Sequence, residues 1–237
     1  SSEFAAQTFN RDRRYKLKRG RTVRDSLRGG KRMKYFIFDV DGTLLNSAEV
    51  DQQCLQQMLR EFGQEHTLEE LRPSFGKPGR QTLADLGFSG EAAERAMDRW
   101  EGLSQERIAE VRVFNGVEAM LKALHERGCR CGIVTSRTHY QYGYGFSPLG
   151  LDGYFDAVIC MEDAPRTKPA PDPLLECLRR MGGEPGEAVY VGDSESDMQC
   201  AAAAGVASCL ALWGCPAPDR IAADVRLAAP GDVLSLI

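Results

Sequence analysis

Short apolar runs alternate with amphipathic segments over most of the chain after Met33. The apolar runs predict strands at 35–40, 130–135, 155–160, 187–192 and 206–211. Between them, residues 116–127 carry apolar side chains at helical spacing behind an expected capping box that begins at Asn115. Residues 173–181 repeat this pattern and stop before Gly182. Strands that alternate with helices predict an α/β fold with a parallel sheet.

One long interval contains no strand-like run. Its apolar side chains lie at helical spacing and predict helices at 48–62 and 90–110. We therefore expect an α-helical cap domain, residues 48–111, inserted into a core formed by residues 33–47 and 112–237.

The composition limits the class of protein. The 237 residues are 43% hydrophobic and 27% charged, which suffices for one core and a smaller insert. No stretch approaches the roughly 20 consecutive apolar residues of a membrane span. The eight cysteines contain no C-x-x-C pair and several fall in apolar runs. We interpret them as reduced core residues of a cytoplasmic protein.

The basic residues are concentrated at the beginning of the chain. Residues 1–32 contain eleven Lys or Arg and three acids, and with a net charge of −4 this leaves −12 for the rest. Such an arm could bind nucleic acid or act as a targeting leader. However, Ser1-Ser2-Glu3-Phe4 resembles a cloning scar, and Met33 would suit a native start. We expect residues 1–32 to be a cloning-derived or disordered leader.

Two carboxylates stand at the end of the first predicted strand, in the sequence D-V-D-G-T that begins at Asp39. Because side chains alternate along a strand, Asp39 and Asp41 are predicted to share a face. Two neighbouring anions repel each other unless a cation or a shared proton compensates them. A divalent metal at a phosphoryl-transfer site would supply that compensation.

Further polar residues follow the other predicted strands. Thr135 and Ser136 end the second, Lys168 lies beyond the third, and Asp193 and Asp197 follow the fourth. Ligands of an open parallel sheet bind beyond the carboxyl ends of its strands. The set offers a carboxylate nucleophile, an acid or base, metal ligands and donors to a phosphoryl oxygen.

The order of these motifs resembles the haloacid dehalogenase superfamily of phosphohydrolases, whose pattern is D-x-D-G-T, then Thr or Ser, then Lys, then G-D-x-x-x-D. The sequences K-P-A-P-D-P and G-D-S-E-S-D are most similar to the branch that contains phosphoglycolate phosphatases and β-phosphoglucomutases. The resemblance spans the body of the chain. It implies a Rossmann-like core with a helical cap directly after the first strand.

The resemblance also implies roles for single residues. Asp39 would attack phosphorus, while Asp41 would protonate the leaving oxygen and then activate water. Thr135 would bind a phosphoryl oxygen, and Lys168 would balance the negative charge. Mg²⁺ would be held by the Asp39 carboxylate, the Asp41 backbone carbonyl, Asp193 and waters.

Other members of the set have weaker or alternative interpretations. Gly42 and Ser136 are expected to add phosphate contacts. Asp197 has either a supporting role for the metal or lysine, or a structural role in a capping box with Ser194. Lys168 could instead be a solvated charge, and Thr135 a β-branched strand residue.

A basic stretch stands out in the acidic cap, where residues 48–111 contain seven Lys or Arg and thirteen Asp or Glu. Residues 72–84 include Lys77 and Arg80 but no acid. We expect the loop around Lys77 and Arg80 to face the site and contact a second anionic group of the substrate. A solvated cap surface is the alternative.

These observations predict a Mg²⁺-dependent phosphatase of a small phosphorylated metabolite, with phosphoglycolate as the first candidate. A β-phosphoglucomutase-like mutase and a pyrophosphatase are alternatives within the superfamily. A binding module that senses phosphate without catalysis would not need the full set of acids, and carbon–halogen cleavage would not need Asp41 as an acid. We expect no nucleic-acid or membrane partner, and a monomer or homodimer.

Overall fold

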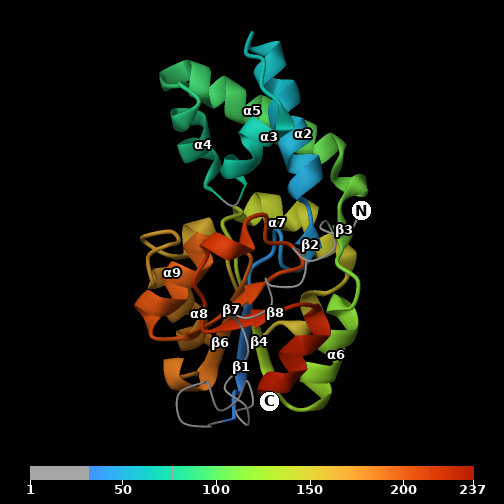
Figure 1. Ribbon diagram of the computed structural model, residues 1–237, viewed down its shortest axis with the longest axis vertical. Coiled ribbons are helices and arrows are strands. Elements are labelled where there is room, and N and C mark those ends of the chain that lie inside the picture. Colours follow the sequence, from blue (N-terminus) through green and yellow to red (C-terminus); the bar gives the residue numbers. More distant parts are fainter. Residues whose placement is uncertain (1–31, 76) are drawn as a thin grey trace, which may run out of the picture.

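The computed structural model describes residues 32–75 and 77–237, so the predicted leader lies outside the described residues except for residue 32. A six-stranded parallel sheet forms the centre of the core, in the order β5-β4-β1-β6-β7-β8 (Figure 1). Its strands are β1 Tyr35–Phe38, β4 Arg130–Val134, β5 Ala157–Ile159, β6 Ala188–Gly192, β7 Ala207–Ala211 and β8 Val225–Leu227. The predicted α/β fold is confirmed, and the three-residue β8 is an addition that is too short to show in the sequence pattern.

The register of the central strands aligns their carboxyl ends. Phe38 at the end of β1 pairs with Ile133 of β4 on one side and with Val191 of β6 on the other. The residues that follow these positions therefore leave the sheet at one edge. This alignment brings three of the predicted motifs together.

Helices cover both faces of the sheet. One apolar cluster joins Phe36 and Phe38 of β1 to α6, and a second joins Ile37 to α8 and α9. The helices of the core are α6 Val117–Glu126, α7 His139–Gly145, α8 Asp172–Met181 and α9 Glu195–Ala204. Because neighbouring strand residues point to opposite faces and both faces are covered, the central strands are apolar throughout.

The predicted helix ends are right in one case and wrong in another. Gly182 ends α8 in the left-handed conformation, as predicted. The capping box expected at Asn115 is absent, since α6 begins after Gly116, which has a φ of +91° and provides no side-chain cap. Gly116 makes the sharp entry turn that a side chain at this position would strain.

The inserted helices lie over the carboxyl ends of the strands (Figure 1). They are α2 Ala48–Glu61, α3 Leu68–Leu71, α4 Gly79–Asp85 and α5 Gly90–Glu106. They enclose an apolar cluster of their own around Leu55, Leu83 and Trp100. The antiparallel pair β2 Leu45–Asn46 and β3 Arg112–Val113 joins the two connections to the core, and the sequence did not predict it.

The helix predicted at 90–110 divides into two parts. α5 ends at Glu106 and a short 3₁₀ turn, Ile108–Glu110, follows it. Ile108 packs against the core cluster and not against the cap. The break therefore carries the chain from the cap back to the core.

The eight cysteines are all free and buried, which confirms that they are core residues. None of the helices in the described part of the chain combines the length and apolar character that a bilayer crossing requires.

Candidate active site

A buried lysine lies between two carboxylates at the edge where the central strands end. Lys168 Nζ lies 3.0 Å from Asp39 Oδ1 and 2.7 Å from Asp197 Oδ1. All three side chains are buried. Burial alone would lower the pKa of Lys168, but Asp197 and Asp39 outweigh it and raise that pKa above its ordinary value. Lys168 therefore stays positively charged at neutral pH.

Asp197 positions this lysine and begins α9 at the same time. Its Oδ2 accepts hydrogen bonds from the Ser194 hydroxyl at 2.6 Å and the Ser194 N–H at 3.1 Å, which is the predicted capping box. Its Oδ1 accepts from Lys168 and, at 2.9 Å, from the Tyr190 hydroxyl. Burial would raise the pKa of Asp197, but Lys168 and these donors hold it below its ordinary value. Both interpretations of Asp197 therefore apply to one side chain.

Asp39 is the carboxyl beside Lys168 whose pKa is raised. Burial raises its pKa to about 7, Lys168 opposes the shift, and the nearby Asp197 and Asp41 add to it. Ionisation of Asp39 is therefore harder than that of a free carboxyl. An additional cation would favour the ionised form, which is the nucleophilic one.

Asp193 is a buried carboxylate without a partner. Neither of its oxygens has a hydrogen-bond partner among the described residues, although only 1% of the residue is exposed. Burial raises its pKa well above the ordinary value, and Asp197 and Asp39 add to the shift. Ligand oxygens of these three acids lie within 4.8 Å of one another. Two orphaned oxygens beside a second carboxylate fit a hard divalent cation such as Mg²⁺.

Gly42 allows the two motif loops to approach each other. Its φ is +78°, and a Cβ at this position would overlap the carboxylate of Asp193. Its N–H donates to Leu45 O at 2.8 Å, so the predicted phosphate contact of Gly42 would require that bond to open. A Cβ on Gly214, in the loop after β7, would overlap the Gly42 carbonyl. The sequence did not indicate that contact.

Asp41 is held by a guanidinium and a hydroxyl. Arg137 donates to both of its oxygens, from Nε at 2.8 Å and from a terminal nitrogen at 2.6 Å, and the Ser47 hydroxyl donates at 2.6 Å. Burial would raise the pKa of Asp41, but Arg137 outweighs it and holds that pKa below its ordinary value. Asp41 is therefore ionised in the free protein. Neither Arg137 nor Ser47 was assigned a role from the sequence.

We expect Arg137→Gln to destabilise the protein more at pH 7 than at pH 3. The pKa of Asp41 is depressed, so the ion pair stabilises the fold fully above the ordinary carboxyl pKa of about 4 and loses this effect as the pH falls from there through the depressed pKa. The pair is partly exposed, so its loss should cost about 1–3 kcal/mol at pH 7. Urea unfolding at the two pH values measures the difference. The exposed Arg80→Gln is the matched control, and an equal loss at both pH values in Arg137→Gln would contradict the assignment.

The second motif loop lies beside this pair. The Thr135 hydroxyl is buried and accepts the Arg137 N–H at 3.2 Å, while Ser136 lines the cavity described next. Thr135 N–H donates to Ile159 O across the sheet, so the backbone of this loop is fixed at its start. His139 does not line the cavity, and its Nε2 lies 2.9 Å from Asp163 Oδ2.

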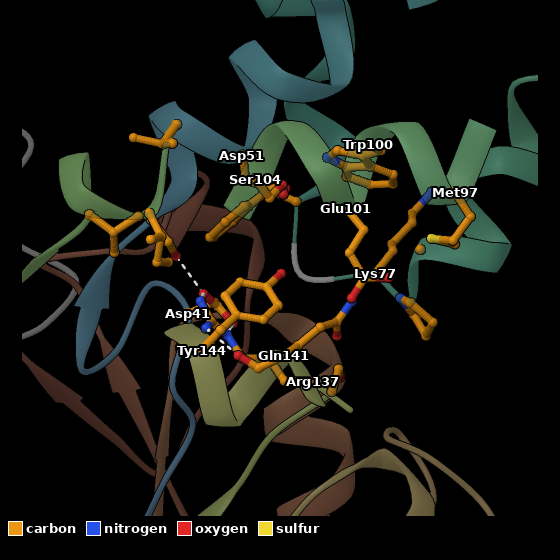
Figure 2. Close-up of a pocket in the computed structure, with 18 of the residues that line it drawn as sticks. Asp41, Asp51, Lys77, Met97, Trp100, Glu101, Ser104, Arg137, Gln141 and Tyr144 are labelled. Carbon is orange, nitrogen blue, oxygen red and sulfur yellow. Dashed lines mark hydrogen bonds and ion pairs between the residues drawn. The ribbon is translucent and has the colours of Figure 1, made fainter. Parts of the chain in front are cut away.

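A cavity lies between the cap and the core and reaches both Asp39 and Asp41 (Figure 2). The core contributes Arg137, Lys168 and α7, which carries Gln141 and Tyr144. The cap contributes side chains of α2 and α5. A ligand in this cavity would contact the carboxylates at one end and the cap at the other.

The two basic cap residues have different positions. Lys77 lines the cavity, but its Nζ lies 2.9 Å from Asp85 in an ion pair. Arg80 is not among the lining residues and pairs with Glu94 on an exposed surface. The contact of Lys77 with substrate therefore stays a prediction, and this conformation does not place Arg80 at the cavity.

Comparison with known proteins agrees with this arrangement. The sequence pattern of the family described as haloacid dehalogenase-like hydrolase matches residues 36–211. A phosphoglycolate phosphatase from Xanthomonas campestris is 37% identical over 205 residues, which are 84% of this chain and 90% of that protein. Pyrophosphatase PpaX from Anoxybacillus flavithermus is 26% identical and covers 85% of this chain and 95% of its own.

The similar solved structures include proteins of the same kind. A Lactobacillus plantarum protein with a suggested phosphoglycolate phosphatase activity superposes with a TM-score of 0.82 at 27% identity, over 87% of this chain and all of that one. The α/β core, the helical cap and the acidic strand ends define a cap-bearing hydrolase. The chain belongs to the haloacid dehalogenase-like hydrolase family and is an enzyme of its phosphatase branch.

Proposed function

We propose that this enzyme is a Mg²⁺-dependent phosphatase that hydrolyses a small phosphorylated metabolite through a phosphorylated Asp39. The observation that carries the proposal is the contact of Asp39 with Lys168 beside the unpartnered Asp193. A phosphoryl group brings more negative charge to a site that already holds the carboxylates of Asp39, Asp41, Asp193 and Asp197. A lysine and a divalent cation together balance that charge.

The residues present suit both halves of the reaction. An oxygen of Asp39 forms a bond to phosphorus, the bond to the leaving oxygen breaks, and protonated Asp41 gives its proton to that oxygen. Asp41, now a carboxylate, then takes a proton from water, whose oxygen attacks phosphorus and releases Asp39. Because Arg137 holds Asp41 ionised in the free enzyme, its guanidinium has to move away from Asp41 when substrate enters.

The remaining residues hold the phosphoryl group. Thr135 and Ser136 would donate to its oxygens, and Lys168 would balance the charge that it shares with Asp39. The carboxylates of Asp39 and Asp193 and the backbone carbonyl of Asp41 would hold Mg²⁺, which supplies charge neutralisation at the phosphoryl oxygens.

Substitution of Asp193 tests the metal assignment. We expect Asp193→Asn to raise the Tm of the metal-free protein slightly, because it removes an unpartnered carboxyl whose ionisation burial makes costly. The same change should remove most of the Tm increase that millimolar MgCl₂ gives the wild type, and should lower phosphate release by at least about 100-fold. Differential scanning fluorimetry with and without EDTA measures the first two effects. An unchanged response to MgCl₂ would reject Asp193 as a ligand.

A second candidate function is pyrophosphate hydrolysis, which the similarity to PpaX favours. A mutase that returns the phosphoryl group to a sugar would use the same first step. A panel of phosphoglycolate, pyrophosphate and sugar phosphates, assayed for released phosphate and for isomerised sugar phosphate, separates these activities. No Mg²⁺-dependent turnover of any phosphate compound would reject the proposed function.

A further inference from the structure

The cap side of the cavity includes polar groups that the proposed reaction does not use, among apolar side chains such as Val50 and Met97. α2 contributes Asp51, and α5 contributes Trp100, Glu101 and Ser104. Burial raises the pKa of Asp51 to about 7, and the nearby Asp41 adds to that shift. Two carboxyl groups and a hydroxyl therefore face the place where the leaving group of a substrate would lie.

One group on this wall is a buried donor without a well-placed acceptor. The indole Nε1 of Trp100 has no hydrogen-bond partner among the described residues, and only 8% of the residue is exposed. Figure 2 shows this nitrogen on the side of the ring that faces Asp51 and Ser104. Trp100 lowers the pKa of Asp51 as a hydrogen-bond donor would, so the indole N–H is directed at the Asp51 carboxyl, although no hydrogen bond of normal geometry joins the two groups. A buried donor whose nearest acceptor is poorly placed costs free energy until a ligand satisfies it.

A hydroxyl group satisfies both members of this pair at once. It accepts a hydrogen bond from Trp100 Nε1 and donates its own proton to the Asp51 carboxylate. Above the raised pKa of Asp51, where that side chain is ionised, a carboxylate could accept from Trp100 but has no proton for Asp51 and would be repelled by it. An ammonium could donate to Asp51 but cannot accept from Trp100.

The charges that line the cavity also favour a hydroxyl group over an anionic group on the cap side. The cationic side chains of the cavity within the described residues are Lys77, Arg137 and Lys168. Lys77 and Lys168 have acidic partners, and Arg137, which pairs with Asp41 in this conformation, belongs to the core and not to the cap wall. Asp51 and Glu101 have no ion-pair partner among the described residues within 4.0 Å. An anionic tail directed at the cap would therefore meet net negative charge.

We propose that Trp100 and Asp51 form a hydroxyl-binding subsite, so that the enzyme prefers phosphate esters of polyols or sugars to those of carboxylates. This inference rests on the proposed function. It places the cap selectivity in α2 and α5, in place of the anionic contact predicted for the basic loop around Lys77.

Three phosphate esters with two-carbon leaving groups provide a matched test, namely 2-hydroxyethyl phosphate, ethyl phosphate and phosphoglycolate. We also include glycerol 1-phosphate, whose longer chain extends the reach of the hydroxyl. The expected order of kcat/KM is glycerol 1-phosphate and hydroxyethyl phosphate above ethyl phosphate, with phosphoglycolate lowest. Phosphoglycolate as the best of the four would overturn the inference. p-Nitrophenyl phosphate reports the phosphatase step alone, and its failure to react would count against the proposed function instead.

Two variants locate the preference in the proposed subsite. Trp100→Phe keeps an aromatic ring and removes the donor, so the ratio of kcat/KM for glycerol 1-phosphate over ethyl phosphate should fall about tenfold. Asp51→Asn should lower the same ratio and raise kcat/KM for phosphoglycolate. Asp98→Asn, an exposed acid on α5, is the matched control and should change neither value. An equal loss for all esters in Trp100→Phe, as expected if the pair only binds a structural water, would contradict the subsite.

Discussion

Asp39→Asn should abolish phosphate release, with a loss of at least about 10³-fold in kcat and little change in the affinity for substrate. Removal of a covalent nucleophile typically costs this much or more, because the remaining groups only position the substrate. The amide keeps the shape of the carboxyl but forms no stable bond to phosphorus. Phosphate release measured over a panel of esters with Mg²⁺, using freshly purified variant, gives the value.

The same substitution should not weaken the fold, and this separates catalysis from stability. Burial raises the pKa of Asp39 to about 7, so the folded metal-free protein keeps a proton that the unfolded chain releases above about pH 4. Its stability therefore falls as the pH rises from 4 to 7, and the amide removes this penalty. The Tm of Asp39→Asn relative to wild type should be more favourable at pH 8 than at pH 4. Turnover that survives in this variant would place the nucleophile elsewhere.

Lys168→Met should be the most destabilising single change in the site. The ammonium balances Asp39 and Asp197, and its removal leaves buried carboxylates without a counter-charge. Breaking a buried pair in this way costs about 3–5 kcal/mol, which corresponds to a Tm decrease of about 10 °C for a protein of this size. Thermal unfolding of the metal-free protein at pH 7 measures it.

The pH dependence and a double variant test whether the lost counter-charge causes the destabilisation in Lys168→Met. Lys168 stays charged below its raised pKa, so the pH dependence of the destabilisation comes from its partners Asp39 and Asp197. The pKa of Asp197 is depressed, and its contribution is present above the ordinary carboxyl pKa and disappears below it. The destabilisation should therefore shrink below about pH 4. Lys168→Met combined with Asp197→Asn should recover part of it, and no recovery would mean that packing dominates.

Much of the core could be predicted because strands that are buried on both faces have a distinct sequence pattern. Phe36, Ile37 and Phe38 form an apolar run, and the following polar residue marks the strand end. The parallel alignment of β1, β4 and β6 then brings the motifs that follow them to one edge. The parallel order of the strands was enough to predict that Asp39 lies near Asp193, without knowledge of any side-chain contact.

The partners of these residues could not be predicted. β1 ends at Phe38, so Asp39 and Asp41 follow the strand, and both line the cavity. Asp41 pairs with Arg137, which is 96 positions away in the sequence. The contact between Gly214 and Gly42 depends on how the loop after β7 folds back. Such contacts join distant segments and leave no local periodicity.

The cap illustrates the same limit. Its apolar stripes identified α2 and α5, but the wall that faces the cavity includes polar side chains such as Asp51 and Ser104. Which polar face turns toward the core depends on how the cap packs over the strand ends. Arg80 was expected at the site because of its charge, yet it pairs with Glu94 on an exposed surface.

The central claim is that Asp39 itself becomes phosphorylated, and chemical trapping tests it most directly. Enzyme mixed with substrate and Mg²⁺ is quenched in acid within one turnover and treated with borohydride, which reduces an acyl phosphate to an alcohol. The account predicts that peptide mass spectrometry will find homoserine in place of Asp39. Homoserine at another position, or none in enzyme that is rapidly releasing phosphate, would contradict it.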